Sequence, residues 1–163
     1  MTTVVVANGL PLAERAFDDL LAEAVDFHGH LCPGQVLGVR MALAGTREVG
    51  IATPRTAGKD FVVFVEIDRC ATDAIQALTG VSLGKRTLKH LDYGKMAATF
   101  VNVASGVAGR VVAREDAAVR ASEPRKKQRS FAAHLAGHFP PLTPVGDPVT
   151  NSRRSSGVVT RAF

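Results

Sequence analysis

The chain has 163 residues, 46% of them hydrophobic, which is enough for one domain with a buried core. No apolar run approaches the roughly 18 residues of a membrane span and no secretory signal opens the sequence, so we expect a cytoplasmic protein. The net charge of +5 comes from residues 113–163, with 9 basic against 4 acidic residues, because residues 1–112 hold 11 of each. This balance argues against nucleic-acid binding by the core.

The first predicted helix begins at Pro11 and ends near Asp26, with apolar residues on one face. The densest group of donor atoms follows it, with His28, His30 and Cys32 within five residues. If this segment is extended, alternate side chains share a face and the three donors point the same way. Imidazole and thiolate together suit zinc, iron, nickel or copper better than Mg²⁺ or Ca²⁺, so the segment predicts part of a transition-metal site.

Pro33 favours the start of a second helix, over residues 34–46, and Gly45 suits its end. Gly34 and Gly38 would let another backbone approach this helix closely. Cys32 then lies at or beside the N-cap, where unpaired N–H groups and the helix dipole favour a thiolate. Cys32 is therefore a candidate metal ligand and a candidate nucleophile or redox centre. The alternative interpretation is a small buried cysteine beside solvated loop histidines.

Residues 60–67 are β-branched and aromatic, which predicts a central strand buried on both faces. The strand ends shortly before Cys70, and a third helix over residues 71–79 is closed by Gly80. Functional groups often lie where a strand leads into a helix, so Cys70 is a second candidate ligand, with a packing role as the alternative. Two cysteines without Cys-x-x-Cys spacing in a reducing compartment favour metal ligands or reactive thiols over a structural disulfide.

The segment 80–87 is similar to a phosphate loop, but its glycines stand one residue too close and Lys85 is followed by Arg86. We therefore reject a nucleotide-hydrolysing P-loop and keep Lys85 as a candidate anion-binding residue. Tyr93 and Lys95 are candidates for an acid, a base or an anion clamp, with a structural Tyr-Gly turn as the alternative.

Residues 96–103 and 107–112 flank a short glycine-containing loop and predict an antiparallel hairpin. Helices gathered before and between such strands predict an α+β fold, with one core domain over 1–112 and an antiparallel or mixed sheet flanked by helices. Residues 113–163 predict a basic extension, partly helical and then mobile. His134 and His138 lie one helical turn apart within it, but without a third donor nearby we do not interpret them as a metal site.

Four segments together resemble the FmdE-like family, which takes its name from formylmethanofuran dehydrogenase. They are Phe27-His28-Gly29-His30-Leu31-Cys32-Pro33-Gly34, Cys70-Ala71-Thr72-Asp73-Ala74-Ile75-Gln76 with Thr79-Gly80, Leu83-Gly84-Lys85, and Asp92-Tyr93-Gly94-Lys95. The resemblance implies an intertwined homodimer whose cavity holds the His and Cys side chains, often with a metal ion. Because no cysteine follows Cys70, we expect the core domain without the family's C-terminal zinc finger.

Two main functions follow for the chain. The first is a metal-binding accessory protein linked to a molybdenum or tungsten oxidoreductase or to one-carbon metabolism, with an open position for a small-molecule ligand. Its expected metal is zinc, with iron, nickel or haem as alternatives. The expected ligands are His28, His30, Cys32 and Cys70.

The second function is an enzyme that uses Cys32 as a thiolate nucleophile or redox centre. In that case Lys85, Tyr93 or Lys95 would bind an anionic substrate. A third hypothesis is an interaction module that docks on a larger oxidoreductase, or on nucleic acid through the basic tail. Binding to a membrane is not expected.

Overall fold

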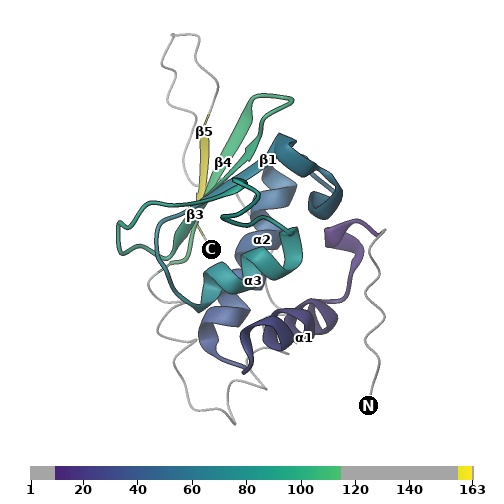
Figure 1. The fold of residues 1–163 in the computed structure, drawn as a ribbon, viewed down its shortest axis with the longest axis vertical. Coiled ribbons are helices and arrows are strands. Elements are labelled where there is room, and N and C mark those ends of the chain that lie inside the picture. Colours follow the sequence, from purple (N-terminus) through teal and green to yellow (C-terminus); the bar gives the residue numbers. More distant parts are fainter. Residues whose placement is uncertain (1–9, 115–157, 163) are drawn as a thin grey trace.

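The computed structural model describes residues 10–114 and the strand at 158–162. Three helices, α1 (Phe17–His28), α2 (Pro33–Glu48) and α3 (Cys70–Thr79), pack on one face of a mixed sheet (Figure 1). The predicted α+β class is confirmed. The strands are β1 (Phe61–Val65), β2 (Leu88–His90), β3 (Ala97–Asn102), β4 (Val107–Val112) and β5 (Val158–Ala162), and their order is β2-β1-β3-β4-β5.

The sheet combines parallel and antiparallel pairs. β1 is parallel to β2 and antiparallel to β3, and β3 and β4 form the predicted antiparallel hairpin around Gly106, which has a positive φ of 72°. β5 pairs with β4 in parallel at the edge. β1 is central, but its residues alternate between buried and half-buried, so the predicted burial on both faces is correct for one face only.

α1 differs from the predicted helix at both ends. A 3-10 turn at Leu12–Glu14 comes first, and Ala16 is extended at the N-cap of α1. Leu12 donates its N–H to Ala52, which ties this turn to the loop after α2. The helix then continues to His28 and ends on Gly29, whose φ of 93° only glycine adopts readily. His28 is therefore the last helical residue and does not belong to an extended segment.

α2 begins at Pro33 with Cys32 as its extended N-cap, as predicted, but it continues beyond Gly45 to Glu48. A Cβ atom on Gly45 would lie 2.1 Å from the ring of Phe100, which is fully buried on β3. Gly45 thus serves close helix-to-sheet packing, and the prediction that it ends the helix is wrong.

Beyond residue 114 the structure describes only β5. The β-branched residues Val158, Val159 and Thr160 suit this strand. The predicted helical part of the extension, His134 and His138 lie outside the described residues, and the division at residue 112 stays a prediction. In the part of the chain that the structure describes, no helix combines the length and apolarity needed to cross a membrane.

Glu66, just after β1, fixes the loop that carries Tyr93 and Lys95. Its carbonyl oxygen accepts the backbone N–H groups of both residues. Its carboxylate binds Arg110 on β4 through two hydrogen bonds, from Nε at 2.6 Å and from Nη2 at 2.7 Å. These hydrogen bonds and the positive charges of Arg110 and Lys95 hold the pKa of Glu66 below its usual value, although burial acts in the opposite direction.

A stability measurement across pH tests this ion pair. Because the folded-state pKa of Glu66 lies below the unfolded value of about 4.3, its stabilisation is complete at neutral pH and is lost as pH falls through the folded pKa. We expect Glu66→Gln to lower the free energy of unfolding by about 2 kcal/mol near pH 7, and by progressively less below about pH 4. Urea denaturation at several pH values measures this difference.

Asp92→Asn is the matched control, because Asp92 is exposed and accepts only a local N–H from Gly94, which asparagine also accepts. A stability difference for Glu66→Gln that does not change between pH 7 and pH 3 would contradict the role of the ion pair.

Candidate metal centre

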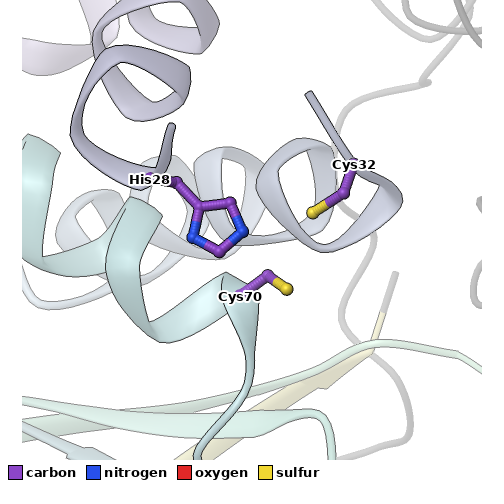
Figure 2. A group of neighbouring side chains, drawn as sticks. All are labelled: His28, Cys32 and Cys70. Carbon is purple, nitrogen blue, oxygen red and sulfur yellow. The ribbon is translucent and has the colours of Figure 1, made fainter. Parts of the chain in front are cut away.

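Three donor side chains meet at one point of the fold. The ligand atoms of His28, Cys32 and Cys70 all lie within 4.8 Å of one another. They come from the last residue of α1, the N-cap of α2 and the first residue of α3 (Figure 2). The fold thus joins Cys70 to a motif that lies 38 residues earlier in the sequence.

Two glycines on α2 allow this meeting. A Cβ atom on Gly34 would lie 2.7 Å from the Cβ of Cys70 and 3.6 Å from the Sγ of Cys32. A Cβ atom on Gly38, one turn later, would lie 2.5 Å from the backbone oxygen of Ala71. The first turns of α2 therefore lie directly against the first turn of α3, and both thiols share the same site.

His28 is oriented by Asp73, which lies on α3 three residues after Cys70. Nδ1 of the imidazole is 2.7 Å from the carboxylate of Asp73, which accepts a hydrogen bond from the Nδ1–H group. Nε2 is buried and has no hydrogen-bond partner among the described residues. The imidazole lies beside the two cysteines (Figure 2). A carboxylate on Nδ1 leaves the lone pair of Nε2 free, which is the arrangement of histidines that bind metal ions.

The two thiols affect each other. Burial raises the pKa of Cys70, and the hydrogen bond and charge of Cys32 raise it further. Two thiolates in contact would repel each other, and a bound cation would offset this repulsion. Cys32 is the N-cap of α2, and Cys70 directly follows Arg69, the N-cap of α3, so the positive ends of both helices lie beside the sulfurs. Neither N-cap residue makes a side-chain cap bond.

Gln35 also supports the site, and this role was not predicted from the sequence. Its side chain is fully buried, and Nε2 donates to the backbone oxygen of Cys70 at 2.7 Å. This bond ties the first turn of α2 to the first residue of α3. The sequence signal for Gln35 was a polar residue among apolar ones directly after Gly34, whereas Asp73 offered no signal because acidic residues are common in the first turn of a helix.

His30 does not join the group in this structure. It is exposed, and its ring lies 4.5 Å from the ring of His28 at an angle of 36°. The predicted common face of residues 28, 30 and 32 required an extended segment, but α1 includes His28 and Gly29 reverses the chain. Ligation by His30 therefore requires its side chain to turn, and it stays a prediction.

The three candidate anion-binding residues also lie outside the group. Lys85 is exposed, and its Nζ donates to the carbonyl of Gly80, which caps the end of α3 opposite Cys70. A ten-residue helix is about 15 Å long, so Lys85 lies far from the thiols. Tyr93 is 63% exposed, and Lys95 is exposed on the same loop. Anion binding by these residues stays a prediction.

Asp73→Asn tests the orientation of His28. An asparagine amide can donate to Nδ1 and place the proton on Nε2, where it blocks a metal ion. We expect zinc affinity to fall about 10- to 100-fold. Competition with a chromogenic chelator measures the affinity, and ¹⁵N NMR of the imidazole reports the tautomer. Asp68→Asn, an exposed position just before α3, is the control, and unchanged affinity in Asp73→Asn would contradict this role.

Comparisons with known proteins give a family match and two similar proteins. Residues 27–137 match the family model described as FmdE, molybdenum formylmethanofuran dehydrogenase operon. A probable S-adenosyl-L-methionine-binding protein of Archaeoglobus fulgidus is 43% identical over 84 residues, which are 50% of this chain and 23% of that protein. The chain thus spans about a quarter of the length of that relative.

Among solved structures, a tungsten formylmethanofuran dehydrogenase FmdE-like protein from Syntrophus aciditrophicus is similar. It is 22% identical, and the TM-score is 0.46 over 55% of this chain and 45% of that chain.

Proposed function

The chain belongs to the FmdE family, and from this premise we propose that it is a transition-metal-binding accessory protein with its metal at His28, Cys32 and Cys70. The family is linked by its description to a molybdenum formylmethanofuran dehydrogenase operon. The observation that carries the proposal is the meeting of one imidazole and two thiols from three separate helices.

The chemistry of these donors supports zinc as the metal. One neutral imidazole and two thiolates balance the charge of a divalent ion, and zinc accepts this N/S set. The free Nε2 of His28 and the short distance between the thiols fit a bound divalent ion. Iron, nickel and haem are the alternatives, because His and Cys donors bind all of them.

A fourth coordination position gives the site a function beyond structure. Structural zinc sites use four protein ligands, whereas sites with three leave a position for water or a small molecule. A metal ion there acts as a Lewis acid on what it binds. The ring of His30 lies 4.5 Å from the ring of His28, and we propose that its exposed imidazole either completes the site or yields to a ligand.

Thiol chemistry at Cys32 is the second candidate function. His28 and Asp73 stand beside the sulfurs in the order of a Cys-His-Asp arrangement, which is specific support for a thiolate nucleophile. The two candidates predict different responses to chelators. A thiolate nucleophile at Cys32 stays reactive after the metal is removed, whereas a metal centre no longer binds the small molecule that its metal ion holds.

The partners are proposals as well. The family description supports a link to a molybdenum enzyme. We propose association with a molybdenum or tungsten oxidoreductase, and a homodimer as the unit that docks there. The name of the Archaeoglobus fulgidus relative makes S-adenosylmethionine a ligand to test, although the shared region is a minor part of that protein. Calorimetry of the full chain with this compound decides whether its binding belongs to the shared region.

Elemental analysis with an absorption spectrum, on protein without an affinity tag, tests the proposed function. We expect about one metal ion per chain in the wild type and almost none in Cys32→Ser, because two donors hold a divalent ion weakly. Partial retention in His30→Ala would show that His30 is not essential. Wild-type protein without metal, even after zinc is added and the excess removed, would contradict the proposal.

A further inference from the structure

Two free thiols face each other across the starts of α2 and α3. Cys32 and Cys70 are both partly exposed, and their sulfurs lie within 4.8 Å. We propose that this pair is a dithiol–disulfide centre that reacts with peroxide, and that its oxidised form cannot hold the metal ion. The second half of this inference rests on the proposed function, and the first half does not.

The geometry suits a bond between the two sulfurs. A disulfide has an S–S length of about 2.05 Å, so the sulfurs need to approach by at most about 3 Å. Gly34 lies between them without a side chain, and its absent Cβ would lie close to Cys70 Cβ and Cys32 Sγ. Cys32 is the N-cap of α2, so rotation of its side chain breaks no helical hydrogen bond. The two sulfurs thus start from a separation that a short approach closes.

The cysteine pair is partly exposed, and the chain has no competing thiol. Both cysteines are only half-buried, so neither residue is sealed inside the core. The sequence contains two cysteines, and both are in this pair. Disulfide formation within one chain thus has a single product, the Cys32–Cys70 bond.

The reaction with hydrogen peroxide balances in two steps. The Cys32 thiolate attacks one peroxide oxygen, the O–O bond breaks, and hydroxide leaves and takes a proton to become water, which leaves a sulfenic acid on Cys32. The Cys70 sulfur then attacks the Cys32 sulfur, the S–S bond forms, and the S–O bond breaks. The departing hydroxide takes the Cys70 proton as a second water. In total two thiols lose two electrons and one peroxide gains them.

Oxidation and metal binding then exclude each other. The disulfide uses both sulfur donors of the proposed centre and leaves only His28 of its three ligands. A bound metal in turn holds both sulfurs as ligands and slows their oxidation. The redox state of the pair would thus decide whether the protein is loaded.

Intact-mass analysis of the full chain tests both halves. After chelation and treatment with one equivalent of hydrogen peroxide, we expect a loss of about 2 Da and a peptide that links Cys32 to Cys70 within one chain, in a proportion that does not change when the protein is diluted. In Cys70→Ser we expect a sulfenic acid on Cys32 that dimedone traps, because the second thiol is missing. Zinc-loaded protein is expected to react more slowly and to release zinc as the disulfide forms.

The outcomes separate this inference from the proposed function. Free thiols after treatment, or links only between chains, would overturn the dithiol centre even if zinc binds. A disulfide that forms while zinc is retained would overturn the mutual exclusion. A disulfide in a protein that never binds zinc would support the dithiol centre and overturn the proposed metal function.

Discussion

His28→Ala is expected to lower zinc affinity by more than about 100-fold, because even residues that only support a ligand cost 10- to 100-fold and His28 is proposed as a ligand itself. Its Nε2 is the buried donor without a protein partner, and its loss leaves two thiols at the site. Competition with a chromogenic chelator measures the change.

His90→Ala is the matched control for this variant. His90 is exposed at the end of β2, and it is not part of the donor group. We expect its zinc affinity to equal that of the wild type. Equal losses in the two variants would show that zinc binds to surface histidines, and would contradict a centre at His28.

Gly38→Ala is expected to lower the free energy of unfolding by about 3 kcal/mol and also to impair metal binding. The added Cβ would lie 2.5 Å from the backbone oxygen of Ala71 and 2.6 Å from the Cβ of Ala74, so the two helices must separate. The better helix propensity of alanine returns only about 1 kcal/mol. Since α2 carries Cys32 and α3 carries Cys70, separation of the helices also moves the thiols apart.

Gly84→Ala controls for the substitution itself, because nothing lies within 4 Å of a Cβ at that position and its φ is not positive. Thermal denaturation and zinc titration of both variants give the comparison. If Gly38→Ala retained wild-type stability and affinity, the close contact of α2 and α3 would not be what positions the site.

Local patterns predicted most of the fold. Three predicted elements depend on residues next to one another in sequence, and all three are present. They are the strand at 60–67, the third helix with its glycine cap and the hairpin after it. β2 was missed because its three residues are too short to give a periodic pattern, and it exists because it pairs with β1. The predicted end of α2 was wrong because Gly45 faces Phe100, a residue 55 positions away in the sequence, and serves packing there.

The donor set was predicted in part for the same reason. Cys32 was placed correctly at a helix start because proline at the first helical position is a local signal. The meeting of Cys70 with His28 and the bond from His28 to Asp73 depend on how α1, α2 and α3 pack, which no local spacing reveals. His30 was placed with the ligands because an extended segment was assumed, whereas the helix continues through His28.

Cobalt substitution tests the central claim most directly, since the spectrum of Co²⁺ reports both the number of metal ions and the kind of ligand. After a chelator has removed any bound metal, titration of the full chain with Co²⁺ is predicted to reach an end point at about one ion per chain. We expect intense thiolate-to-cobalt charge-transfer bands and the strong visible absorption of a tetrahedral ion, and both should be displaced by zinc. A weak octahedral spectrum without thiolate bands would contradict a metal centre built from His28, Cys32 and Cys70.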